Sequence, residues 1–452
     1  MPSTEAARRV ELEPAQAFAL AQHMHRQGEL DAAEALYDRL IGSAPRHAAA
    51  LHFMGVLQHQ RHRSESALAL IRRSIALDAK VPGWHNNLGN VLLELKQLDA
   101  AADAYEAAAR LGPDRADIFN NLGVLRREQQ RYPEAEAAYR RAMALDPQYA
   151  DALSNLGRLL YGIGRVEESL DAYWQAVTLR PRHAQTRMTL GIAYYRLGRL
   201  DEAVGVFTEW LADEPDSPEA RHHLAACSGQ AVPGRAADAY VETVFDSFSA
   251  SFDAKLAMLH YRAPELIGEA VQALVGDGTR SLRVIDAGCG TGLCGPLLAP
   301  YAARLDGVDL SSGMLAKAAQ RQIYDQLHKA ELTAFIEGRE AGACDLIVSA
   351  DTLCYFGEIE PVAHACRHAL AAGGWLVFTV EALTTGSAGF HLNPHGRYSH
   401  HADYLRVVLA DAGFERVGLQ AVELRMEGTQ PVEGWVATAQ APAGSMPASA
   451  SD

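Results

Sequence analysis

The first half of the chain repeats one pattern of apolar and small residues every 34 positions. A glycine recurs at this step without insertion, usually with a leucine just before it and an alanine twelve positions later. This spacing fits two amphipathic helices per unit, with the small residue where the helices touch and a ring filling the next layer. The glycines are Gly55, Gly89, Gly123, Gly157 and Gly191, and the rings are Tyr105, Tyr139, Tyr173 and Phe207.

The 34-residue period resembles the tetratricopeptide repeat, which implies an α-solenoid. The register predicts six units over residues 14–217, followed by a capping helix and connector over residues 218–237. One unit cannot bury its apolar faces alone, so neighbouring units must stack, and the curvature of the stack creates a concave groove. The resemblance therefore implies a peptide or protein partner in that groove.

An asparagine recurs at one position of three consecutive units, immediately before the Leu-Gly pair: Asn87, Asn121 and Asn155. An amide both donates and accepts hydrogen bonds, so a row of amides suits a peptide backbone of any sequence. The row resembles the asparagine ladder of O-GlcNAc transferases, although only three units carry it. Two hypotheses stay open: the asparagines bind a partner, or they bond between neighbouring repeats.

From residue 281 the pattern changes to apolar strands, glycine turns and helices in alternation, which is typical of a parallel sheet with crossover helices. The strand LRVID leads into a turn that contains Asp286, Gly288, Gly290 and Gly292. Glycine lets the backbone approach a ligand closely, and the following helix offers unpaired N–H groups. A second strand ends at Asp309, whose carboxylate can accept hydrogen bonds from both hydroxyls of a ribose. The pattern predicts an adenosine-containing ligand.

The glycine spacing distinguishes between cofactors. A dinucleotide-binding GxGxxG turn requires glycine where the chain has Leu293. The glycine at 292 instead resembles the first motif of class I S-adenosylmethionine-dependent methyltransferases, and the resemblance covers residues 238–440. It implies a Rossmann-like sheet with flanking helices and S-adenosyl-L-methionine as the cofactor.

The same resemblance assigns further residues to the cofactor. In VDLSSGML it implies that Asp309 binds the ribose and that Leu310 and Met314 line the adenosine. Glu331 stands where the family commonly has an aspartate that contacts the adenine amine. Asp351 follows the fourth predicted strand, DLIVSA, at the end of the sheet where ligands bind in such folds.

Three residues are candidates for the acceptor side of the site. Tyr355 lies shortly after the fourth predicted strand, while Tyr398 and His400 lie in a predicted loop, NPHGRYSH. His400 or Tyr398 is a candidate general base, because histidine titrates near neutrality and can take a proton in the transition state. A solvated histidine-rich loop is the other interpretation.

An aromatic segment, FDSFSASFD, precedes the first strand. It resembles the N-terminal segment of ubiquinone/menaquinone-biosynthesis methyltransferases, which folds over the bound cofactor. Phe248, Phe252 and Tyr261 would then screen the sulfonium from water and attract it with their ring faces. Ordinary helix packing is the alternative.

Charge and composition narrow the function further. The net charge is −15, and residues 1–225 carry 26 Lys and Arg against 30 Asp and Glu. Nucleic-acid binders show a basic footprint, so no nucleic acid is expected as a partner. No apolar run approaches the ~20 residues of a membrane span, and no signal peptide begins the chain, so we expect a cytoplasmic protein without membrane contact.

The six cysteines lack paired spacing, which predicts neither a metal site nor disulfides. Residues 441–452 are small and polar, and we expect them to be disordered.

Together these patterns predict a methyltransferase that modifies a peptide, protein or protein-carried acceptor recruited by the repeats. A small-molecule methyltransferase whose repeats serve only protein assembly is a second hypothesis. A non-catalytic scaffold is a third, which the intact Asp286, glycine turn and Asp309 disfavour. Fold alone does not decide the substrate.

Overall fold

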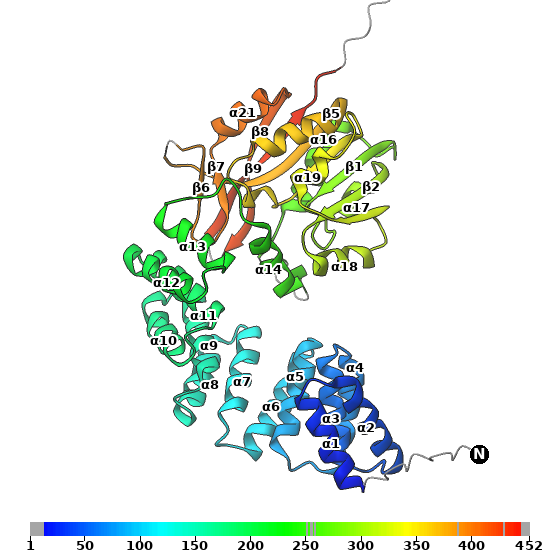
Figure 1. Ribbon diagram of the computed structural model, residues 1–452, viewed down its shortest axis with the longest axis vertical. Coiled ribbons are helices and arrows are strands. Elements are labelled where there is room, and N and C mark those ends of the chain that lie inside the picture. Colours follow the sequence, from blue (N-terminus) through cyan, green and yellow to red (C-terminus); the bar gives the residue numbers. More distant parts are fainter. Residues whose placement is uncertain are drawn as a thin grey trace, which may run out of the picture. The chain divides into compact units, whose positions relative to one another are not determined.

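The computed structural model (Figure 1) describes residues 13–249, 252–253, 256, 259–386, 388–427 and 430–443. The chain divides into two compact units, Met1–Thr186 and Arg187–Asp452. The predicted tail 441–452 lies outside the described residues from 444 onward.

The first unit consists of helix pairs, each with a first helix of 13 residues and a second of 14. Consecutive pairs pack against each other in chain order. Helix α11 (Ala184–Arg196) spans the division between the two units. The helices before it are α1 (Pro14–Arg26), α2 (Leu30–Ser43), α3 (Ala48–Gln60), α4 (Ser64–Leu77), α5 (Pro82–Glu94), α6 (Leu98–Leu111), α7 (Ala116–Glu128), α8 (Tyr132–Leu145), α9 (Ala150–Gly162) and α10 (Val166–Leu179).

Contact between a glycine and the ring sixteen positions later explains the period in four successive helix pairs, while Gly55 meets Ile71 in the pair before them. A Cβ atom placed on Gly89 would lie 2.5 Å from the Tyr105 ring, and one on Gly123 would lie 2.5 Å from the Tyr139 ring. Both tyrosines are buried. Only glycine lets the two helices approach over such a ring, so the predicted α-solenoid and its small-to-large packing are confirmed.

The second unit begins with helices that the sequence places in the last repeat and the cap, α12 (Leu200–Asp213) and α13 (Pro218–Ser228). The compact division therefore falls inside the sixth predicted repeat and not at residue 217. Side chains of α13 bond to the loop that precedes β7. The Nε2 atom of His222 lies 2.9 Å from the carbonyl oxygen of Gly396, and Nδ1 of His223 lies 3.0 Å from that of Pro394.

A nine-stranded sheet forms the centre of the second unit, in the order β3-β2-β1-β4-β5-β7-β6, with β9 pairing to β5 and β8 to β9. The pairings among β1 to β5 and between β5 and β7 are parallel, while β5–β9, β6–β7 and β8–β9 are antiparallel. The strands are β1 (Leu282–Ala287), β2 (Ala302–Asp309), β3 (Gln326–Lys329), β4 (Cys344–Ser349), β5 (Leu370–Ala382), β6 (Phe390–Leu392), β7 (Tyr398–His400), β8 (Glu415–Glu427) and β9 (Gln430–Gln440).

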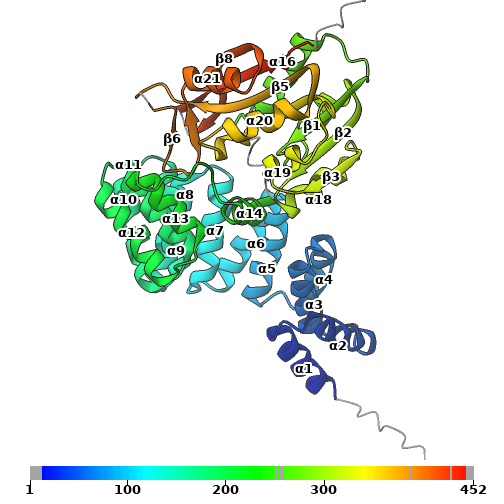
Figure 2. The ribbon, with the colours of Figure 1, turned by 45° about the horizontal axis from the view of Figure 1, so that its top comes forward.

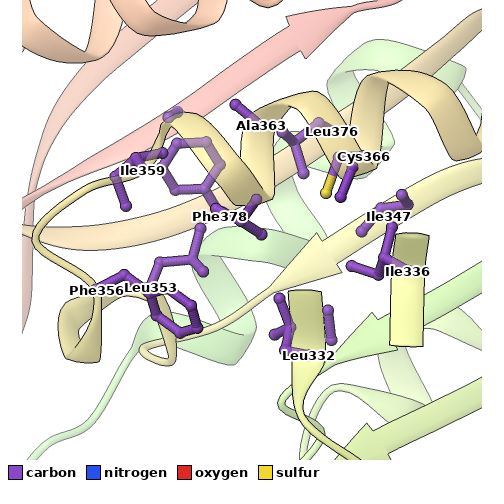
Figure 3. Close-up of a cluster of buried hydrophobic side chains, with 14 of the residues drawn as sticks. Leu332, Ile336, Ile347, Leu353, Phe356, Ile359, Ala363, Cys366, Leu376 and Phe378 are labelled. Atoms are coloured by element: carbon purple, nitrogen blue, oxygen red, sulfur yellow. The ribbon is translucent and has the colours of Figure 1, made fainter. Parts of the chain in front are cut away.

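Helices flank this sheet, as the sequence predicts for a Rossmann-like fold. Figure 2 shows α20 against β5. In Figure 3, Phe378 of β5 and Ile347 of β4 meet Ala363 and Cys366 of α20, and all four side chains are buried. The helices are α14 (Asp238–Phe248), α16 (Ala263–Val275), α17 (Gly295–Leu298), α18 (Ser312–Gln320), α19 (Leu332–Glu337), α20 (Glu360–Ala369) and α21 (Ala402–Asp411), with a 3₁₀ turn, η2, at Leu353–Tyr355.

The predicted loop over residues 393–400 is only partly a loop. Its last three residues form β7, which pairs with both β6 and β5. Periodicity did not reveal this strand, because three residues are too few for an alternating pattern. Within the described residues, no helix combines the length and apolarity that crossing a membrane requires.

Candidate functional site

A cavity of about 290 Å³ lies where the parallel strands end, because residues that follow β1, β2 and β4 line it. Ligands of open α/β sheets bind at this edge. The lining is largely apolar, with a few polar groups at defined positions, as small-molecule sites generally are. Of the predicted site residues, it includes Gly288, Gly290, Asp309, Leu310, Glu331, Asp351 and Tyr355.

Asp309 ends β2 and is held by the backbone on both carboxylate oxygens. Gly290 donates its N–H to Oδ2 at 2.9 Å, and Ser311 donates its N–H to Oδ1 at 2.8 Å. Burial raises the pKa of Asp309, and these two bonds oppose that rise. Each oxygen of a carboxylate accepts more than one bond, so both remain able to accept from ribose hydroxyls.

Two glycines of the turn line the cavity, and the third packs against a neighbouring ring. Gly288 and Gly290 line the cavity with φ of +78° and +53°, which L side chains rarely adopt. A Cβ on Gly290 would project into open space, whereas one on Gly288 would lie 2.1 Å from the Thr352 hydroxyl. Gly292 is outside the lining, and its neighbour is the Tyr324 ring, 3.0 Å from a Cβ placed there.

Asp286 lies beneath the turn and outside the cavity lining. Its Oδ2 accepts a hydrogen bond from the Tyr324 hydroxyl at 2.6 Å, and its Oδ1 is buried without a partner. Burial raises the pKa of this carboxyl to about 7. The predicted role in cofactor binding is therefore indirect at most, since the side chain supports the turn from below.

Met314 and Glu331 occupy different positions relative to the cavity. Met314 is buried in α18 and does not line it. Glu331 does line it, but it also caps α19, accepting N–H bonds from Thr333 at 3.0 Å and Ala334 at 2.8 Å. The aspartate that the family commonly has at this place could cap the helix in the same way.

Open space at Gly290 and the carboxylates of Asp309 and Glu331 together fit the adenosine part of S-adenosylmethionine. The glycine backbone leaves room for a ligand to approach closely, and the two carboxylates could accept hydrogen bonds from hydroxyl and amine groups. These hydrogen-bond acceptors thus suit the cofactor that the sequence predicts.

Asp351 and Tyr355 line the cavity together with Arg397, which sequence reasoning missed. Nη1 of Arg397 lies 3.5 Å from Asp351 Oδ2 and 3.4 Å from Glu381 Oε1, and its guanidinium carbon lies 6.0 Å from the centre of the Tyr355 ring. Arg425 donates to the same Glu381 oxygen at 2.6 Å. Burial opposes ionisation of Glu381, but His395 and the two arginines outweigh it and lower its pKa.

Tyr398 and His400 are not brought to the cavity. Both are buried in β7, where Tyr398 donates its hydroxyl to the carbonyl of Pro233 at 2.8 Å and His400 Nε2 lies 3.2 Å from that of Gly357. Burial lowers the pKa of His400 to about 4. The alternation of β7 points these side chains into packing, so the structure gives no support to either as general base.

The aromatic segment does contribute to the cavity. Phe252 and Tyr261 line it, and so does Phe245, which opens the FDSF motif but was not among the predicted residues. The Phe245 ring lies 6.0 Å from that of Phe252 and 5.5 Å from that of Tyr355. The Phe248 side chain lies outside the described residues.

The three asparagines of the ladder bond to the preceding repeat. Asn121 donates its amide to Asn86 at 3.1 Å, and Asn155 donates to Asn120 at 2.8 Å. The amide nitrogen of Asn87 lies 3.1 Å from Nε2 of His52. This geometry favours the second hypothesis from the sequence, that the asparagines join neighbouring repeats.

All six cysteines are buried and free of disulfides. Cys289 and Cys294 line the cavity, and burial raises the pKa of each thiol well above its ordinary value. Across the part of the chain that the structure describes, no group of three or more His, Cys, Asp or Glu side chains is placed to hold a metal ion.

Comparison with known proteins agrees with both halves of this architecture. Residues 285–376 match the methyltransferase domain family, and residues 18–83, 86–150 and 154–218 match the tetratricopeptide repeat family. Human methyltransferase-like protein 27 is 33% identical over 111 residues, which are 24% of this chain and 43% of that protein. A ubiquinone biosynthesis O-methyltransferase of Ralstonia nicotianae is 28% identical over 169 residues, covering 34% and 68%. The pilus biogenesis factor PilW has a TM-score of 0.44 at 18% identity, covering 46% of this chain and 96% of its own.

The two family matches thus follow one another along the chain, tetratricopeptide repeats first and a methyltransferase domain after them. The chain spans less than half of the human relative.

Proposed function

We propose that the chain is an S-adenosylmethionine-dependent methyltransferase. The placement of Asp309 carries the proposal, because its carboxylate ends β2 in the cavity wall and is oriented by the Gly290 N–H of the glycine turn. Asp309 and Glu331 would hold the ribose hydroxyls and the adenine amine, with Leu310 against the adenosine. The names of the relatives and the matching domain support the same activity.

The bound cofactor supplies a methyl group made electrophilic by its sulfonium. The protein has to align the acceptor and exclude water, and proximity of this kind is worth on the order of 7–11 kcal/mol. Phe245, Phe252 and Tyr261 line the cavity and would screen the methyl group from water once cofactor and acceptor fill it.

The test of this proposal is cofactor identity. Saturating S-adenosylhomocysteine should raise the melting temperature of the full chain, because a ligand that prefers the native state stabilises it. NAD and NADP should not, since Leu293 occupies the place of the third dinucleotide glycine. Stabilisation by NAD or NADP alone would overturn the assignment.

For the acceptor, we propose a peptide, a protein or a molecule carried on a protein, recruited by the repeats. The contact of α13 with the loop before β7 supports it, because the helix after the last repeat bonds to the segment that carries Arg397. Incubation of the enzyme with cell extract and radiolabelled cofactor should place the label in the protein fraction.

The second candidate is a small-molecule methyltransferase whose repeats serve assembly. The likeness to the ubiquinone biosynthesis O-methyltransferase favours it, as does a cavity whose size suits small ligands. Label that stays in the low-molecular-weight fraction, with none on protein, would decide for this alternative.

A further inference from the structure

The cavity has two chemically different ends. Asp309 ends β2 and Asp351 follows β4, while β1 lies between these strands. A strand spacing of about 4.8 Å therefore separates the two carboxylates by roughly 10 Å. Arg397 contacts Asp351, which places it at the end of the cavity away from the adenosine residues. A positively charged group thus lies in the part of the cavity that the proposed adenosine leaves open.

The contacts of Arg397 leave it available to an anion. Its ion pairs with Asp351 and Glu381 are long, at 3.5 and 3.4 Å, while Glu381 is bound more closely by Arg425 at 2.6 Å. The side chain of Arg397 is 24% exposed and lines the cavity, in contrast to Arg425, which is 2% exposed and does not. Two arginines balance the two carboxylates of this cluster, so the end of the cavity at Arg397 carries no net negative charge.

The surroundings of Arg397 suit an acid with an apolar body. Tyr355 lies beside its guanidinium, and Tyr261 and Leu259 line the same cavity. Arginine binds carboxylates through two parallel N–H bonds, which lysine cannot form. The other arginine in the lining, Arg235, is bound to Asp238 at 2.5 Å.

The described lining of the cavity contains no histidine and no lysine that would serve as general base. Burial raises the pKa of Tyr355 to about 12 and that of Tyr261 well above its ordinary value, so both hydroxyls stay protonated at neutral pH. An acceptor that is already ionised needs no base. Carboxylic acids, with an ordinary pKa near 4, meet this condition.

We propose that Arg397 binds a carboxylate of the methyl acceptor and that this carboxylate is the group methylated. The proposal rests on the methyltransferase function above and names its substrate class. A lone pair of the carboxylate oxygen forms the new C–O bond as the C–S bond of the cofactor breaks. The products are a methyl ester and neutral S-adenosylhomocysteine, and no proton is taken up or released.

Binding of paired probes tests the recognition step. The full chain saturated with S-adenosylhomocysteine is titrated calorimetrically with phenylacetate, octanoate and a blocked Gly-Glu-Gly peptide, each beside its primary amide. The acids should bind at least tenfold more tightly than the amides, as expected for a hydrogen bond between charged groups. Equal binding of every acid and its amide, or no binding of any acid, would overturn the proposal.

Variants of the two arginines separate recognition from support of the ion-pair cluster. R397Q should remove the preference for acids. R425Q also removes one positive charge beside Glu381, but Arg425 does not line the cavity, so this variant should keep the preference. R397K tests the same point with the charge retained, and should bind the acids severalfold more weakly. Should R397Q fail to fold, R397K decides, and an unchanged preference in R397K would contradict the proposal.

The product tests the transfer step. Methyl label transferred to a carboxylate is released as methanol at alkaline pH, whereas label on a hydroxyl or an amine stays in place. Release from phenylacetate or octanoate would indicate a free acid as substrate, and release from the glutamate peptide alone would indicate a protein carboxylate. Alkali-stable label on any accepted probe would refute methyl ester formation.

The proposed function fails separately from this inference. If S-adenosylhomocysteine does not raise the melting temperature of the wild-type chain, the methyltransferase proposal is refuted. A normal response without any preference for acids would refute the role of Arg397 alone.

Discussion

The hydroxyl of Tyr324 donates a hydrogen bond to Asp286 at 2.6 Å, directly beneath the glycine turn. The other carboxyl oxygen of Asp286 is buried and unpaired, and burial is the main reason that its pKa rises to about 7. The turn that approaches the proposed cofactor is thus supported by a buried acid that is costly to ionise.

Replacement of Asp286 by asparagine should change how stability depends on pH. Between about pH 4 and pH 7 the native state of the wild type holds a proton that the unfolded state loses, so its stability falls as pH rises. Asparagine does not titrate, so D286N lacks this pH dependence. Its free energy of unfolding relative to that of the wild type should therefore increase over that range by up to ~1.4 kcal/mol per pH unit. Urea unfolding at several pH values measures the difference. A difference that is constant with pH would contradict the elevated pKa.

Replacement of Asp309 by alanine should weaken binding of S-adenosylmethionine by ~1.5–3 kcal/mol, the range for a hydrogen bond to a charged group. The variant should fold, because the backbone N–H groups of Gly290 and Ser311 lie beside a cavity that water can enter. Calorimetry with the cofactor measures the loss, and the melting temperature without ligand controls for folding. Unchanged affinity in a folded variant would refute the ribose role.

Replacement of Asn121 by alanine should destabilise the repeats by about 1–2 kcal/mol, because it removes the donor of the Asn86 amide oxygen and one of the two donors of Asn90, which still accepts from Tyr105. D103A is a suitable control, since Asp103 is exposed on α6. Denaturant unfolding of both variants gives the comparison. If N121A and D103A are equally stable, the asparagines do not join the repeats and the partner-binding hypothesis is favoured.

Acidification should loosen the contact between α13 and the loop before β7. Burial lowers the pKa of His223 to about 4, with a smaller contribution from His222, although the bond to the Pro394 carbonyl opposes the shift. The unfolded chain therefore takes up a proton first, and stability falls as pH drops from about 6.5 towards 4. H223N keeps an N–H donor without titrating, so its loss of stability over this range should be smaller. Parallel acid titrations that coincide would contradict this account.

The sequence determined the features that depend on local spacing. Gly89 and Tyr105 recur at a fixed 34-residue period, which was enough to predict paired helices with a small residue at the helix contact and a ring in the packing beside it. Asp309 and Gly290 were likewise predictable, because a strand that ends in an acid beside a glycine turn places both at one edge of a parallel sheet.

Only the tertiary structure decided which polar side chains reach the cavity. Arg397, Tyr398 and His400 lie within four positions of one another, and nothing in their spacing separates them. The pairing of β7 with β5 and β6 buries Tyr398 and His400 away from the cavity, while Arg397, just before the strand, lines it. Tyr398 and His400 have familiar proton chemistry, which made them the candidates in the sequence. The register of β7 places Arg397 at the cavity. A segment of three residues cannot specify that register, because the packing of distant strands imposes it.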